Sequence, residues 1–420
     1  MEDMVLLKLN WMVICMNDKT LKIIAVCKGW GHYTDESSTL EALTNFFSDL
    51  YGHPTHFYTY EEVEAKLVEA TKRYVEDYPG VLPSTPNTSN TISASALIEN
   101  GYIKDLSSYT KDETVICNGS VDIFLSNLDN YNYVPSLYCG AKYETIKLAD
   151  KVAADNDYGV VSGSGLYQRV NGKFITDEQD LSNTGSADTF EYVFRGDEVN
   201  NYVKIDENYW RIVSISDTND IYMIYVGTVQ KSSPWDDRYN ELVDKNQGIN
   251  VYEDSGIKSR VMQKVEEFYN GEVILKNKEP YSEKTKYLIT PMDICVGKRS
   301  TTATDISGKI ECSKILEEQY VGLLPAYYYM SASLDDNCTT IVSKSCGNYN
   351  YFSDFDDYWW LLTANEESTN EAFAVSQKSV DTFYCSNKSS VRPTILLGSR
   401  AAYESGSGTY EDPYIVKYFE

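Results

Sequence analysis

Histidine is almost absent from this chain of 420 residues. The sequence contains 3 histidines, His32, His53 and His56, and none follows them. Nucleophilic hydrolysis by serine or cysteine needs a base beside the nucleophile. The sequence therefore excludes a Ser-His or Cys-His site from the rest of the chain, unless the N-terminal segment folds over it.

Basic residues are scarce relative to acidic ones. The chain has 37 Lys and Arg against 63 Asp and Glu, which gives a formal net charge of -26 at pH 7. A protein that binds a phosphate backbone needs a field of the opposite sign. The composition therefore predicts no nucleic-acid partner, and its simplest consequence is solubility.

Long apolar runs are missing as well. No stretch reaches the ~20 apolar residues of a membrane-spanning helix. The best candidate, MVLLKLNWMVICM, is interrupted by Lys8 and Asn10 and lacks the basic start and cleavage site of a signal peptide. Paired with TLKIIAVC, it predicts a β-hairpin. We expect residues 1–57 to be an atypical N-terminal segment, made of this hairpin and a short helix over 40–50.

The cysteines lack the close CxxC pairs that are typical of zinc sites. Disulfides in an oxidising compartment fit their surroundings better. Cys15 and Cys27 have two interpretations. They bind a metal ion together with His53 and His56, or both thiols are buried as apolar side chains. Local spacing predicts three disulfides and one unpaired thiol, which are Cys117–Cys139, Cys295–Cys312, Cys338–Cys346 and Cys385.

Residues 58–150 predict a small helix-plus-sheet module. The stretch YEEVEAKLVEATKRYVEDY is apolar at helical spacing, Thr59 and Glu62 form a capping-box pattern, and Pro79-Gly80 ends the helix. SASALIEN predicts a second helix, which ends at Gly101. The strand-like pieces between Cys117 and Cys139 predict a hairpin or small meander closed by a disulfide.

The remaining chain predicts a linker and a larger β-rich module. Residues 151–190 are rich in Gly, Ser, Asp and Asn, and we interpret them as the connection between modules. Residues 191–420 contain a meander near Trp210, a helix over 254–270 and many short strands, among them DDYWWLLT and VRPTILL. The chain is therefore predicted to be α+β and dominated by sheets.

Residues 60–148 carry, in order, AKLVEATKRYVEDY, ISASALIENGYIKDL and YVPSLYCG. This region resembles the globular part of type IV pilin-like surface proteins of Gram-positive bacteria. The resemblance implies a pilin-like module, an extracellular location at the cell surface and self-assembly into a filament. In that family an apolar spine precedes the helix, whereas residues 1–57 contain no GFTLIE-like start and show no signal or anchor.

Residues 192–420 carry YVFRGDEVNNYVKIDENYWRIVSI, ICVGKRS, YVGLLPAYYYMSAS, YWWLLTANE and SSVRPTILLGS in this order. Together they resemble a domain of unknown function that is common in surface proteins of gut Firmicutes. That domain is related to the C-type-lectin-like and formylglycine-generating-enzyme-like sheet folds. The resemblance implies a mostly β, C-type-lectin-like module, and the catalytic relatives use a reactive cysteine pair.

Aromatic and acidic residues supply the candidate binding site. The 36 tyrosines exceed the 13 phenylalanines and 6 tryptophans together, and aromatic side chains dominate recognition surfaces. Acidic loop pairs such as Asp236-Asp237 and Asp335-Asp336 leave calcium open as a ligand, while no other cofactor is expected. Trp210 is expected to pack in the core. For Trp359 and Trp360, the alternative to ligand contact is packing inside the protein. The predicted contact residues are Trp235, Asp354, Asp356, Asp357, Tyr358, Trp359 and Trp360.

We therefore expect a bacterial surface protein for adhesion or ligand display, without catalysis. Its partner would be a glycan or a host or bacterial surface protein. One alternative is an enzyme on the formylglycine-generating-enzyme-like fold that uses Cys338 or Cys346. Another is a purely structural pilus or surface subunit.

Overall fold

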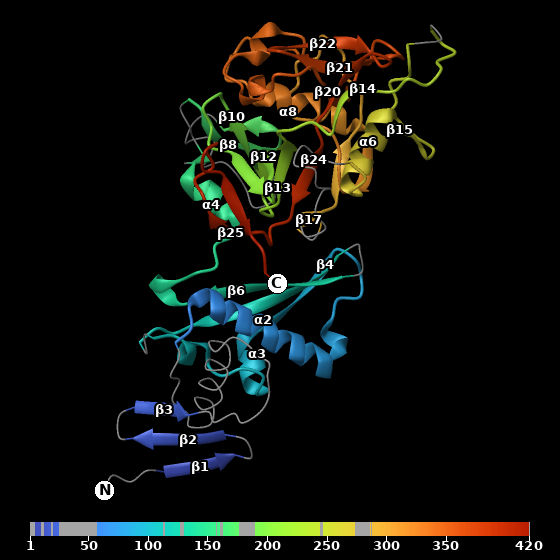
Figure 1. Ribbon diagram of the computed structural model, residues 1–420. Helices are drawn as coiled ribbons and strands as arrows, with labels where there is room; N and C mark the ends of the chain where they lie inside the picture. Colours follow the sequence, from blue (N-terminus) through green and yellow to red (C-terminus); the bar gives the residue numbers. More distant parts are fainter. Residues whose placement is uncertain are drawn as a thin grey trace.

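The computed structural model (Figure 1) describes most of the chain, and some of its N-terminal part as backbone only. Side chains are described for 57–111, 114–126, 130–156, 163–175, 190–243, 247–273, 286 and 288–419. The backbone is also described for β7 (Tyr158–Gly159) and for three N-terminal strands. These strands are β1 (Val5–Leu9), β2 (Met12–Asn17) and β3 (Thr20–Ile24).

The N-terminal strands pair in the order β1-β2-β3. In the β2–β3 hairpin Asn17 lies opposite Thr20, which confirms the predicted turn. The apolar stretch before that turn folds into two strands, β1 and β2, because the pairing reverses after Leu9. The helix expected over 40–50, the three histidines, Cys27 and the side chain of Cys15 lie outside the described residues.

The first module packs α2 (Tyr60–Asp77) against a three-stranded antiparallel sheet. The predicted capping box is present: the Thr59 backbone N–H donates to Glu62 Oε2 at 2.7 Å, and the Glu62 backbone N–H donates to Thr59 Oγ1 at 3.3 Å. Val63 and Leu67 form the buried face of α2. The other elements are β4 (Thr88–Ser93), α3 (Ala94–Glu99), β5 (Asn118–Leu125) and β6 (Tyr131–Tyr138).

The second module contains a large, mainly antiparallel sheet with the strand order β17-β24-β13-β12-β10-β8-β7. The predicted meander forms β11, β12 and β13, and its turns place Asp206 and Asn219 at positive φ. The strands are β8 (Gly165–Val170), β9 (Lys173–Phe174), β10 (Phe190–Arg195), β11 (Tyr202–Ile205), β12 (Asn208–Ser216), β13 (Ile221–Tyr225), β17 (Ile289–Thr290), β24 (Thr394–Leu397), β25 (Ala402–Ser405) and β26 (Tyr414–Lys417).

The predicted linker over 151–190 is wrong where it is described. The helix α4 (Leu148–Asp155) and the strand β8 belong to the second module, and Val152 and Leu166 are fully buried in its core. The Gly- and Asp-rich pieces that suggested a linker surround short apolar segments, and these segments supply the buried contacts. Composition averaged over the whole stretch hid them.

A second, five-stranded sheet has the order β14-β23-β20-β21-β22. Its central strand carries the two adjacent tryptophans, and every residue of that strand is buried. Because adjacent side chains of a strand point to opposite faces, both faces of this sheet are covered there. The strands are β14 (Gln230–Pro234), β20 (Trp359–Ala364), β21 (Glu371–Ser376), β22 (Ser379–Tyr384) and β23 (Lys388–Val391).

Among the described residues, the second module also contains the helices α6 and α8 and two small two-stranded sheets. α6 begins six residues after the predicted start, because Ser255 and Gly256 take positive φ and turn 253–258 into a hairpin. The Ser259 side chain then caps the helix. These elements are β15 (Glu253–Asp254), β16 (Ile257–Lys258), α6 (Arg260–Tyr269), β18 (Met292–Cys295), β19 (Ile315–Gln319) and α8 (Ala326–Ser331).

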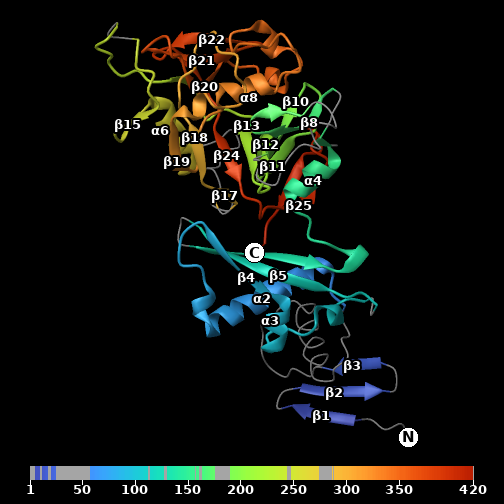
Figure 2. The ribbon, with the colours of Figure 1, turned by 180° about the vertical axis from the view of Figure 1, so that it is seen from behind.

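The C-terminal strands connect the two modules, and both views place the C-terminal end between them (Figure 1 and Figure 2). β26 runs parallel to β11 and carries Lys417, whose Nζ lies 2.6 Å from Oε2 of the buried Glu64 on α2. Tyr143 and Thr145 also donate hydrogen bonds to Glu64. The chain is thus α+β with mostly β structure, as predicted. Among its described residues, no helix combines the length and apolar character needed to span a membrane.

Candidate functional site

The three tryptophans predicted as ligand contacts are all inside the second module. Trp235, Trp359 and Trp360 are each 0% exposed. The indole N–H of Trp360 donates to the Ser233 carbonyl at 2.8 Å, and that of Trp235 donates to the Leu361 carbonyl at 3.1 Å. The prediction that they contact a ligand at the surface is therefore wrong. Trp359 and Trp360 belong to β20, the central strand of a sheet covered on both faces, and Trp235 is bonded to that strand.

The loop before β20 is exposed, but two of its three carboxylates are occupied. Asp354 accepts from the buried Arg211 at 2.8 Å, and Asp357 lies 4.0 Å from Arg392. Tyr358 stacks on Phe383 at the surface, and Asp356 is exposed beside it. The loop lacks the tryptophan platform that the sequence suggested, because both tryptophans are buried. The predicted contact set is thus split between core and surface.

Three of the carboxylates considered for calcium, those of Asp236, Asp237 and Asp335, are engaged by side chains of the protein. Among the described residues, no group of three His, Cys, Asp or Glu side chains is arranged to hold a metal ion. The two carboxylates of Asp236 and Asp237 pair with Arg238 and Arg260. Asp335 accepts from Asn348 at 2.7 Å, and this bond lowers its pKa.

All three predicted disulfides are present. They join Cys117 to Cys139, Cys295 to Cys312 and Cys338 to Cys346. Cys385 is the free thiol of the described part of the chain, and burial raises its pKa far above the usual range. Disulfides of this kind are typical of oxidising compartments. The thiol pair that the catalytic alternative needs, Cys338 and Cys346, is oxidised.

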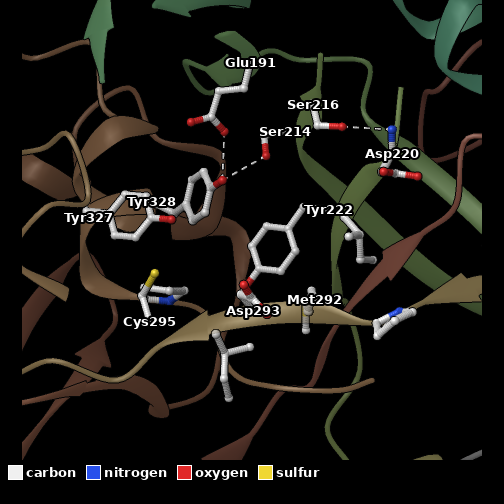
Figure 3. A pocket seen from close by; sticks show the side chains of 14 residues that line it. Glu191, Ser214, Ser216, Asp220, Tyr222, Met292, Asp293, Cys295, Tyr327 and Tyr328 are labelled. Carbon is white, nitrogen blue, oxygen red and sulfur yellow. Dashed lines mark hydrogen bonds between the residues drawn. The ribbon is translucent and has the colours of Figure 1, made fainter. Parts of the chain in front are cut away.

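A cavity of about 450 Å³ in the second module is a stronger candidate site (Figure 3). We call it the tyrosine–carboxylate pocket. Strands of the large sheet form one side, α8 forms another, and β18 with Pro291 forms a third. The residues that line it are Glu191, Ser214, Ser216, Asp220, Tyr222, Pro291, Met292, Asp293, Ile294, Cys295, Pro325, Tyr327, Tyr328 and Leu396.

The strand register explains why these residues meet. Tyr222 on β13 lies opposite Leu396 on β24 and Ser214 on β12. Two residues after Ser214 on β12, Ser216 lies opposite Glu191 on β10. Directly opposite residues share one face of a sheet, so two parallel rows of side chains point toward the cavity.

Glu191 is the most firmly held group of the pocket. Arg169, its cross-strand neighbour on β8, is 1% exposed and donates from Nε to Glu191 Oε1 at 2.9 Å. Tyr328 donates its hydroxyl to Glu191 Oε2 at 2.8 Å and lies 3.1 Å from Ser214 Oγ (Figure 3). Burial and then the charge of Glu191 raise the pKa of Tyr328. This carboxylate is therefore oriented by two partners and remains 26% exposed.

The rest of the lining is aromatic and acidic. Tyr222 donates to Thr394 Oγ1 at 3.0 Å, and burial raises its pKa. Asp220 and the exposed Asp293 add two carboxylates, and Asp220 accepts the backbone N–H of Ser399 at 2.8 Å. No Lys or Arg belongs to the described lining. The pocket can therefore stack on a ligand and accept hydrogen bonds from it, while it repels anions.

Comparison of the chain with protein-family models, with curated proteins and with solved structures gives no match in any of the three. Sequence reasoning missed Glu191, Tyr222 and Tyr328. The available signals were a Glu between two aromatic residues in the strand FEYVFR and three consecutive tyrosines in AYYYMS.

Proposed function

We propose that this chain is a non-catalytic ligand-binding protein of the bacterial cell surface that acts in adhesion. In this proposal the tyrosine–carboxylate pocket holds a neutral polyhydroxyl group or a cationic group of the ligand. The resemblances to pilin-like and C-type-lectin-like modules support the setting. The disulfides support an oxidising location.

The observation that carries the proposal is the oriented carboxylate of Glu191 among tyrosine rings. Sugar hydroxyls and ammonium groups both donate hydrogen bonds to carboxylates, and both pack on aromatic faces. A phosphate or sulfate group would meet Glu191, Asp220 and Asp293 without a cation on the lining. The net charge of -26 adds a repulsive field for anions.

Binding to a glycan array and to immobilised surface proteins tests this function. Glu191→Gln and Asp293→Asn should weaken any bound ligand at least tenfold, because each removes one acceptor charge from the pocket. Asp356→Asn and Tyr358→Ala are the matched controls, since both residues lie on the exposed loop before β20. Losses confined to the controls would reject the pocket and restore that loop as the binding surface.

The two alternatives have separate tests. Thiol titration of the native protein should find no reactive thiol in the described region, where six cysteines are paired and Cys385 is buried. A low-pKa thiol at Cys338 or Cys346 would favour the enzyme. Sedimentation at high concentration should give a monomer, whereas concentration-dependent filaments would favour a structural subunit.

A further inference from the structure

A second cavity of the same module has the opposite character. It measures about 220 Å³ and shares no lining residue with the tyrosine–carboxylate pocket. Lys298 and Lys314 belong to its lining, so we call it the lysine pocket. Its walls come from the segment after β18, from β20 and from the chain before β15.

Lys298 is held in place by a neutral partner. Its ammonium donates to Asn250 Oδ1 at 2.7 Å. The Asn250 amide nitrogen donates in turn to the carbonyls of Asn365 at 2.8 Å and Ser368 at 2.7 Å, which fixes the direction of its oxygen. No carboxylate of the described chain lies within ion-pair distance of Lys298. Because an ammonium has three donors, two remain for another acceptor.

Other polar groups of the pocket also lack strong partners. The Tyr252 hydroxyl is buried and has no hydrogen-bond partner among the described residues. Lys314 is exposed, and its Nζ reaches only the Glu253 carbonyl, at 3.5 Å. The Glu253 carboxylate is occupied by the Gly256 backbone N–H at 2.6 Å. The cavity thus presents the unused donors of Lys298 and Lys314, and the Tyr252 hydroxyl is buried behind its wall.

Apart from Ser313, the remaining lining is apolar. Val251 and Val296 contribute accessible carbon surface, and Trp235, Leu362 and Ala364 lie buried behind it. A fully hydrated inorganic anion gains little from such walls. A ligand with one negative group and a small apolar body matches both halves of the cavity.

We propose that the lysine pocket binds a small organic carboxylate with a short aliphatic or aromatic body. Its carboxylate accepts from Lys298, and its body packs against the partly exposed Val251 and Val296. Lys314 adds positive charge at the mouth. This site is independent of the adhesive function proposed above, because the two pockets share no residue.

Calorimetric titration of the full chain with benzoate and butyrate tests the proposal, with benzamide and inorganic phosphate as comparison probes. Benzoate or butyrate should bind saturably, and Lys298→Met should weaken this binding at least tenfold. Lys309→Met, at an exposed position outside the pocket, should leave it unchanged. Equal binding of benzamide would overturn the need for charge, and equal or tighter binding of phosphate would overturn the need for an apolar body.

A measurement on the protein without substitutions tests the proposal even if the Lys298→Met variant does not fold. Burial lowers the pKa of Lys298 below that of an ordinary lysine. The affinity for carboxylates should therefore begin to fall at a pH below the one at which exposed lysines lose their protons. Affinity that stays constant until ordinary lysines titrate, or no carboxylate binding at millimolar concentration, overturns the proposal.

Discussion

The two pockets of the second module lie on either side of one short stretch of chain and carry opposite charge. Residues 291–295 line the tyrosine–carboxylate pocket, and residues 296–298 line the lysine pocket. Both belong to a chain with a net charge of -26. Their difference teaches that the charge of a site is set by the few groups held beside it, and that the average of the chain predicts it poorly.

The stretch between the pockets is held rigidly. The Cys295–Cys312 disulfide ties it to the turn at 311–313, and the Gly297 backbone N–H donates to the Glu311 carbonyl at 2.6 Å. Arg299 and Glu311 form an ion pair in which both side chains are 0% exposed. A Cβ on Gly297 would lie 2.6 Å from that same carbonyl, so the two chain segments approach as closely as glycine permits.

The largest effect is expected from Arg299→Met. Removing one partner leaves the Glu311 charge buried without compensation, which costs about 3–5 kcal/mol of unfolding free energy. Because the shared wall loosens, binding in both pockets should weaken together. Urea unfolding and both titrations check this. Loss in one pocket alone would show that they do not depend on a common wall.

A smaller and one-sided effect is expected from Arg169→Met. Glu191 is partly exposed, so its unpaired charge should cost only about 2 kcal/mol of unfolding free energy. Ligand binding in the tyrosine–carboxylate pocket should fall, and carboxylate binding in the lysine pocket should not change. The double variant Arg169→Met/Glu191→Gln should recover part of the stability. No recovery in urea unfolding would mean that Arg169 acts mainly through its contacts with aromatic rings.

The smallest perturbation is a change of pH, which should separate the pockets without any substitution. Burial lowers the pKa of Lys298 below 10.5 and raises the pKa of Tyr222 and Tyr328 above 10.0. Raising the pH toward 10 should therefore weaken binding in the lysine pocket first. The other pocket should be unaffected there, because its tyrosines keep their protons. Parallel titrations at each pH check the order, and a simultaneous loss would contradict it.

Tyr222 and Tyr328 also predict whether raising the pH stabilises or destabilises the folded protein. In the unfolded chain they titrate near 10.0, and in the folded protein their pKa is raised. Their contribution to stability is complete below that pH and is lost as the pH rises above it. The part of the tyrosinate absorbance that is missing in Tyr222→Phe and Tyr328→Phe variants should thus appear together with unfolding, whereas exposed tyrosines ionise earlier. Ionisation of these tyrosines in a folded protein would contradict their burial.

The sequence predicted features that depend on neighbours along the chain. The Thr59–Glu62 capping box spans one helical turn, and the Cys338–Cys346 disulfide closes a loop with a separation of 8 residues. The turn of the meander at Asn219 is equally local. In each case the interacting groups are close in sequence, so residue type and spacing were sufficient.

The pockets depend on strand order, which local patterns do not contain. Glu191 and Tyr328 are 137 residues apart, and Lys298 and Asn250 are 48 apart. Trp359 and Trp360 drew attention because tryptophan is common at binding surfaces. Whether both lie in the core depends on the strands that flank β20, namely β23 and β21. The sequence alone could not assign those neighbours.

The ion pair between Glu64 and Lys417 has a consequence for protein synthesis. Its partners are 353 residues apart, so the ribosome makes the buried carboxylate of the first module long before its cation. At ~5–20 residues per second the delay is tens of seconds, during which Tyr143 and Thr145 are the described partners that stabilise the charge. The nascent first module is therefore less stable than the same module in the finished chain, and it completes its stabilisation only after β26 has paired with β11.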